Sequence, residues 1–119
     1  MNASDILNTV DVRVVPLVIP EWNNLEVCIR SHDGHARAII EAEYAKTPRP
    51  TTLTATIACL SLSDEAGNPL FEYTPANVQL LAKKSGVALD RILIAASDLN
   101  SLTPQAIEDE KETLPEITP

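Results

Sequence analysis

The side chains most able to do chemistry are two histidines and two cysteines, and their spacing limits what they can do. His32 and His35 are three residues apart, so on a helix they would share one face. A metal site needs a third or fourth ligand, usually from a facing element. The neighbouring Asp33 does not indicate such a ligand, because an acidic residue at this position is typical of a helix start. We therefore interpret this segment as a solvated helix N-terminus and expect no metal.

Cys28 and Cys59 are too far apart in the sequence to form a C-x-x-C motif, which excludes a zinc ribbon or a thioredoxin motif. Both lie in apolar segments, and a cysteine packs as a small hydrophobic residue. We interpret them as free, buried thiols.

No set of residues in the sequence has the spacing of a catalytic site. Glu41 and Glu43 are next but one to each other and Asp64 and Glu65 are adjacent, which is typical of exposed, solubilising charge. With only three glycines, the chain has no glycine-rich loop to cradle a phosphate. The sequence therefore predicts a protein that is not an enzyme and that needs no cofactor.

The composition of the chain further limits which class of protein it can be. Its 119 residues suit one domain, and 45% apolar residues with only four aromatic side chains predict an aliphatic core. A net charge of −8 argues against binding to nucleic acid or to an anionic membrane. There is neither a long apolar run nor a basic N-terminal stretch, so we expect neither a membrane span nor a signal peptide.

The N-terminal third predicts a β-hairpin preceded by a short, mobile helical turn. Ser4 is a plausible N-cap for a turn that ends near Asn8. Residues 12–19 are β-branched and aliphatic, and residues 25–30 alternate apolar and polar side chains. Residues 20–24 form the connection, because proline fixes the bend and asparagine tolerates positive φ.

The middle of the chain contains one predicted helix and one segment whose type the sequence leaves open. Ser31 caps a helix that stops before Pro48, with Ala38, Ile39, Ala42 and Ala45 as its apolar positions. Residues 51–63 fit a helix by the spacing of their leucines and isoleucine, yet their threonines and alternation also suit a strand. Their length of about 13 residues favours a helix.

The last third predicts a turn, two helices and a tail. Gly67 supplies the positive φ of a turn over residues 64–68, and an extended stretch follows to Phe71. Thr74-Pro75 begins a helix, Ser85-Gly86 breaks it, and residues 87–99 form the main core helix. We expect Val14, Leu25 and Ile92 in the core.

These elements predict an α+β fold: an N-terminal β-hairpin packed against a bundle of three to four helices. The domain covers residues 1–102. Residues 103–119 carry five acidic side chains and one lysine, which is half of the net charge, so we expect a mobile acidic tail with at most a helical turn after Pro104.

Four sequence blocks in this order resemble the tail assembly chaperones of long-tailed phages, of the siphophage type. They are Pro20-Glu21-Trp22-Asn23-Asn24 at the hairpin turn, the helix opened by Ser31, the block Leu60 to Phe71 containing Asp64-Glu65-Ala66-Gly67, and the closing segment Lys84 to Leu102. The chain departs from the family in three places. Asn23-Asn24 replace a glycine pair, which is mild because asparagine accepts a left-handed conformation. Ala66 replaces an acid, and the segment from Arg37 to Ala42 lacks the family's usual bulky helix residues.

The resemblance implies a non-catalytic protein that binds the tape measure protein and recruits tail tube subunits. It also implies a homo-oligomer, a frameshift-extended form of the same chain as a further partner, and action in the host cytoplasm with absence from the mature virion. The alternative is a minor structural tail protein or a small acidic adaptor or inhibitor. Three apolar residues are candidates for partner binding: Trp22, Leu70 and Phe71.

Overall fold

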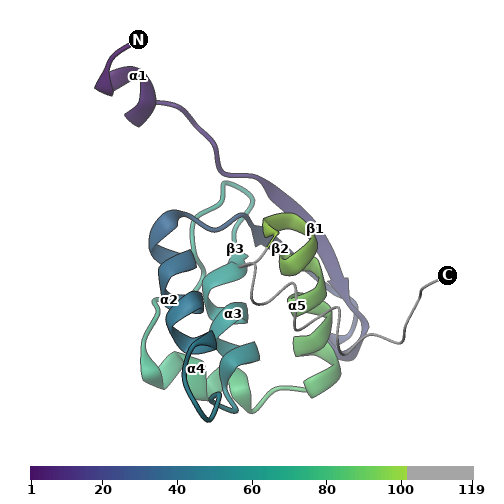
Figure 1. The fold of residues 1–119 in the computed structure, drawn as a ribbon. Helices are drawn as coiled ribbons and strands as arrows, with labels where there is room; N and C mark the ends of the chain where they lie inside the picture. Colours follow the sequence, from purple (N-terminus) through teal and green to yellow (C-terminus); the bar gives the residue numbers. More distant parts are fainter. Residues whose placement is uncertain (102–119) are drawn as a thin grey trace, which may run out of the picture.

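The protein is an α+β domain in which a small antiparallel sheet carries a layer of helices, as the sequence predicts (Figure 1). The computed structural model describes residues 1–101, so the acidic tail expected at 103–119 lies outside the described residues. The elements in chain order are α1 (Ala3–Leu7), β1 (Val14–Ile19), the 3-10 turn η1 (Pro20–Trp22), β2 (Leu25–Arg30), α2 (Gly34–Tyr44), α3 (Leu53–Ser61), β3 (Leu62–Ser63), α4 (Pro75–Ala82) and α5 (Gly86–Asn100).

The sheet has the order β1-β2-β3, and its first two strands are the predicted hairpin. β1 and β2 pair along their full lengths, from Val14 opposite Arg30 to Ile19 opposite Leu25. The turn works as expected, because Asn23 and Asn24 both adopt left-handed conformations, with φ of 56° and 60°. The third strand was not expected: β3 is only two residues long, pairs with Cys28 and Ile29 of β2, and bridges to Pro69 on its other side.

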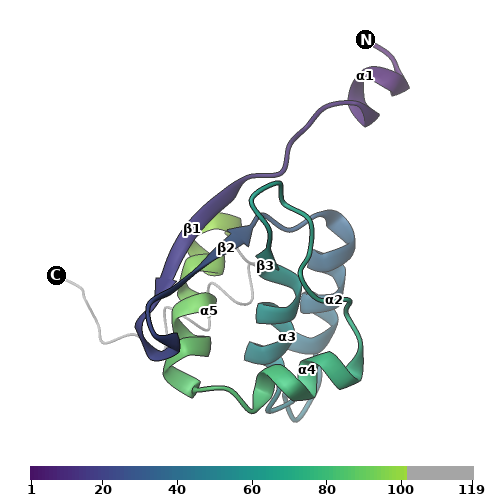
Figure 2. The ribbon, with the colours of Figure 1, turned by 180° about the vertical axis from the view of Figure 1, so that it is seen from behind.

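Helices α2 to α5 lie on one side of the hairpin, with α5 against the strands and α3 packed against α2, α4 and α5 (Figures 1 and 2). The open question at residues 51–63 is settled in favour of a helix that ends in a short strand. Every residue of α3 from Ala55 to Ser61 is buried. Because α3 is covered on all sides from Ala55 onward, Thr56 and the small side chains of this helix pack inside the core.

Two of the predicted N-caps are wrong. Asn2 caps α1 in place of Ser4, and Asp33 caps α2 in place of Ser31, where its carboxylate accepts the Ala36 N–H at 2.8 Å. The Ser31 hydroxyl accepts the Arg13 N–H instead, at the start of β1. The predicted cap at Thr74 is confirmed, and Ser85 caps α5 at the predicted helix break.

The core is aliphatic, but its membership differs from the expectation. Ile92 is fully buried, whereas Val14 is only half-buried and Leu25 is exposed. Leu25 lies at the turn end of β2 and is not covered. Val27 and Ile29, which lie further along the same face of the strand, are buried. In α2 the buried positions are Ala36 and Ile40, which are four residues apart and share one face of the helix. Of the positions that were expected, Ala38, Ala42 and Ala45 are exposed and Ile39 is half-buried.

Two isoleucines on α5 provide a matched test of this core. We expect Ile92→Ala to lower the free energy of unfolding by about 3 kcal/mol, because it removes fully buried methyl groups and leaves a cavity. Ile94 is exposed on the same helix, so Ile94→Ala should change stability by less than about 0.5 kcal/mol. Urea denaturation of both variants measures the difference. Equal losses would contradict the assignment of the buried face of α5.

Candidate functional site

An apolar depression lies between the hairpin turn and α4, and we call it the hairpin groove. It has a volume of about 540 Å³. All three predicted partner-binding residues line it, although they come from two separate segments of the chain. Its lining consists of Glu21, Trp22, Asn23, Leu25, Val27, Leu62, Leu70, Phe71, Leu81 and Lys84.

The hairpin groove has a buried floor and an accessible rim. Val27, Leu62 and Leu81 are buried members of the core, whereas Leu70 is 54% exposed and Leu25 is similarly open. A second depression shares Leu25, Val27 and Leu70 with the groove and continues along β2 toward the turn at residues 63–66. The accessible apolar surface is therefore continuous around this end of the sheet, which suits an apolar segment of a partner better than a small polar molecule.

An ion pair holds the turn that carries Trp22. The Arg91 guanidinium on α5 donates two hydrogen bonds to the Glu21 carboxylate, from Nε to Oε1 at 2.8 Å and from Nη2 to Oε2 at 3.0 Å. The hydrogen bond from Arg91 lowers the pKa of Glu21, and the pKa of Arg91 is raised in turn. Because this contact joins η1 to a helix distant in sequence, it sets the position of the groove wall. The sequence pattern did not indicate it.

A polar turn positions Leu70 and Phe71. The Asp64 carboxylate oxygen Oδ1 accepts the N–H groups of Ala66 and Asn68, both at 2.9 Å. Both bonds lower the pKa of Asp64, and the bond from the Asn68 N–H has the larger effect. Gly67 has the expected positive φ of 90°. The chain then returns beside β3, where the Leu70 N–H donates to the Leu62 carbonyl at 3.1 Å.

Adjacent acidic residues in this turn provide a second test. We expect Asp64→Ala to lower the melting temperature, because two backbone N–H groups lose their acceptor. Glu65→Ala removes a neighbouring exposed carboxylate and should leave the melting temperature nearly unchanged. Thermal unfolding followed by circular dichroism compares the two. If Glu65→Ala lowers it equally, Asp64 does not support the turn.

The histidines are not brought together as a site. His35 is exposed on α2, whereas His32 precedes that helix and its Nε2 lies 2.7 Å from the Ser61 hydroxyl. Within residues 1–101, no three His, Cys, Asp or Glu side chains are grouped to hold a metal ion. Cys59 is buried and Cys28 is half-buried, and both are free thiols.

Burial makes His32 a source of pH-dependent stability. Its pKa is lowered to about 4, first by desolvation and then by the charge of Arg30, with Arg37 acting in the same direction and Asp33 opposing. The unfolded chain, with a histidine pKa near 6.5, therefore binds more protons between pH 6.5 and pH 4. Stability from this residue is present above pH 6.5 and is lost as the pH falls through that window.

We expect the wild-type protein to lose about 1 to 2 kcal/mol more stability than His32→Gln between pH 7 and pH 5, allowing for partial exposure of the ring. Denaturant titrations at the two pH values measure both losses. The exposed His35 is present in both proteins, so any contribution it makes drops out of the difference between the two losses. Equal losses in the two proteins would show that His32 titrates normally.

The fold is that of a phage tail assembly chaperone. The structure of the bacteriophage HK97 tail assembly chaperone aligns with a TM-score of 0.61 and 20% sequence identity. The alignment covers 84% of this chain and 98% of that one. At this identity the likeness shows a shared fold. No protein-family model matches the sequence, and no curated protein matches it. Among residues 1–101, no helix combines the length and hydropathy that crossing a membrane requires.

Proposed function

We propose that this protein is a tail assembly chaperone of a long-tailed phage and acts without catalysis. The observation that carries the proposal is the structural likeness to the HK97 tail assembly chaperone, which extends over almost the whole of that chain. The four sequence blocks that resemble the family support it independently. One of them forms the hairpin turn and another forms the turn before Leu70, so both border the hairpin groove.

The client that suits this role is the tape measure protein, whose long helices carry apolar stripes. An amphipathic helix binds by placing its apolar face in a hydrophobic groove. The hairpin groove offers such a surface, and Trp22, Leu70 and Phe71 are the side chains that would contact the client. The net charge of −8 would make coated clients repel one another and stay soluble.

The remaining partners follow from the same role. The protein would recruit tail tube subunits to the coated tape measure protein, associate with further copies of itself and with a frameshift-extended form, and act in the host cytoplasm. It would leave before the virion is mature. Mass spectrometry of purified particles separates this role from the alternative, because peptides of this chain in the particles would favour a minor structural tail protein.

Two leucines of similar exposure allow a controlled test of client binding. Leu70 lines the groove at 54% exposure, and Leu80 on α4 is 59% exposed and does not line it. We expect wild-type protein and Leu80→Glu to keep a co-expressed fragment of the tape measure protein from the same genome soluble and to co-elute with it. Leu70→Glu should lower the affinity for the fragment by about tenfold or more, because a charge enters the apolar contact.

The affinity is measured by titrating the purified fragment into each variant. A fragment that stays insoluble with the wild-type protein, and forms no complex, would contradict the chaperone role. Equal binding by Leu70→Glu and Leu80→Glu would place the client outside the hairpin groove while leaving the chaperone role intact.

A further inference from the structure

Residues 1–11 form an arm that stands away from the domain, with α1 at its end (Figures 1 and 2). None of these residues is buried. The arm nevertheless carries large apolar side chains: Leu7 is 82% exposed, Val10 is 86% exposed, and Ile6 and Met1 are also open to solvent. Exposed apolar residues gathered on a projecting segment indicate a surface that contacts a partner.

The arm has a defined helical conformation and is not simply an extended end. The Asn2 side chain accepts the Asp5 N–H at 3.0 Å, and the Asp5 carboxylate accepts the Asn2 N–H at 2.8 Å, which is a capping box. The Thr9 hydroxyl donates to the Asp5 carbonyl at 2.7 Å. A helix of five residues is too short to be stable alone in water, so its apolar face needs a surface to pack against.

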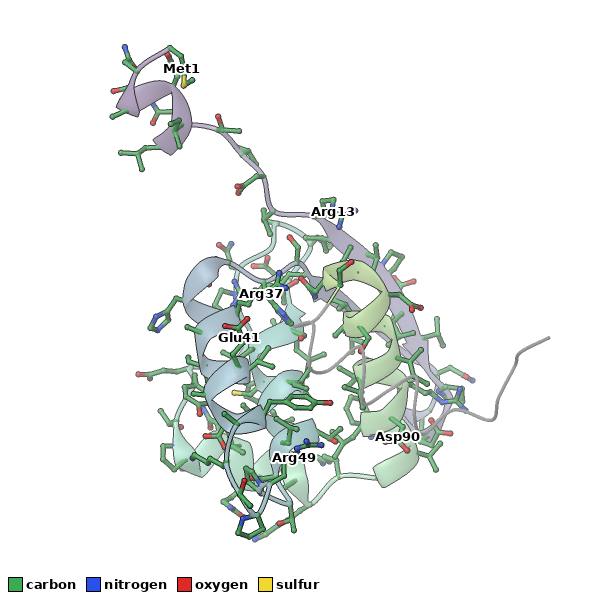
Figure 3. The ribbon with its side chains drawn as sticks, in the orientation of Figure 1. Met1, Arg13, Arg37, Glu41, Arg49 and Asp90 are labelled. Atoms are coloured by element: carbon green, nitrogen blue, oxygen red, sulfur yellow. The ribbon has the colours of Figure 1, made fainter. Side chains whose placement is uncertain are left out.

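The base of the arm is fixed to the domain at the end opposite the hairpin groove. Arg13 donates its N–H to the Ser31 hydroxyl at 2.8 Å and its Nη2 to the Leu99 carbonyl at 2.7 Å. Figure 3 shows Met1 at the far end of the arm, Arg13 at its base, and Asp90, near the start of α5, at the other end of the domain. The hairpin turn, which supplies Glu21, Trp22 and Asn23 to the groove, follows Ile19 at the other end of β1, so the arm points away from this wall of its own groove.

The groove of another copy matches the arm in chemistry. Its rim is apolar at Trp22, Leu25 and Leu70. Its lining holds one base, Lys84, next to Lys83, and one acid, Glu21, whose charge is already paired with Arg91. The arm presents apolar side chains flanked by Asp11 and by Asp5, which lies 4.0 Å from the N-terminal amino group. Apolar faces and opposite charges therefore correspond. Pairing of the free edge of β1 between copies is disfavoured, because Pro16 lies in that edge strand and lacks an N–H.

We propose that the N-terminal arm of one copy, residues 1–11, lies in the hairpin groove of a second copy. Because arm and groove are at opposite ends of the domain, the contact is head to tail, and each copy can bind one neighbour on each side. The arm also regulates the groove: it covers the apolar surface until a client displaces it. Only this regulatory consequence rests on the proposed function.

Charge substitutions in the arm and in the groove test the contact in full-length protein. We expect the double variant Ile6→Glu/Leu7→Glu, and separately Leu70→Glu, to raise the dissociation constant for self-association by about tenfold or more. The matched controls add the same charge at exposed apolar residues outside the arm and the groove: Leu80→Glu/Ile94→Glu for the arm variant, and Leu80→Glu for the groove variant. Both controls should stay within about twofold of the wild type in sedimentation over a concentration series.

Mixing the two defective variants tests the head-to-tail geometry. Leu70→Glu retains an intact arm and Ile6→Glu/Leu7→Glu retains an intact groove, so the mixture should form a one-to-one pair and nothing larger. A mixture that stays monomeric overturns the proposal, as does a wild-type protein that is monomeric at every concentration. Self-association that none of these substitutions weakens also overturns it.

Trp22 is the only tryptophan of the chain and lines the groove, so its fluorescence reports directly on occupancy. A peptide of residues 1–12 added to full-length Ile6→Glu/Leu7→Glu should shift the Trp22 emission to shorter wavelength, and the peptide with the same two substitutions should not. A shift caused only by the tape measure fragment would overturn the arm contact and leave the proposed function standing. A shift caused by the arm peptide in a protein that binds no tape measure fragment would support the arm contact and contradict the proposed function.

Discussion

The enclosure of α3 is the constraint on which the rest of the structure depends. This helix packs against α2, α4 and α5, and its chain continues directly into β3, which pairs with the hairpin. Its buried side chains are mostly small, such as Ala55, Ala58 and Ser61, so neighbouring helices can approach closely. Large isoleucines from the surrounding elements, among them Ile29, Ile40 and Ile92, complete the interior.

The hairpin groove exists because two segments extend past this enclosed centre. The hairpin turn packs beside α5 and is held there by the contact between Glu21 and Arg91. The segment after Gly67 returns along β3 and brings Leu70 to the same edge. Neither segment has a helix laid over it, so apolar residues that would otherwise be interior remain accessible. The fold thereby separates a rigid, buried core from an apolar surface available for binding.

Much of the fold could be predicted from sequence because its signals are local. Asn23-Asn24 indicated the turn and Thr74-Pro75 indicated a helix start, and both are confirmed. The errors arise where a distant contact decides the outcome. Ser31 was a plausible cap, but its hydroxyl bonds to Arg13. Leu25 has the pattern of a core residue, but it stays 53% exposed at the rim of the groove. The groove itself had no local signal, since residues far apart in sequence build it.

The isolation of residues 1–11 from the interior also affects how the chain can change over evolutionary time. Substitutions in the arm carry little folding penalty, because no side chain there is buried. Substitutions in α3 carry a large one, since almost any added atom meets a packed neighbour. Variation among descendants of this gene should therefore accumulate at different rates in the two segments. The arm is free to adapt to whatever it touches, whereas α3 preserves the architecture.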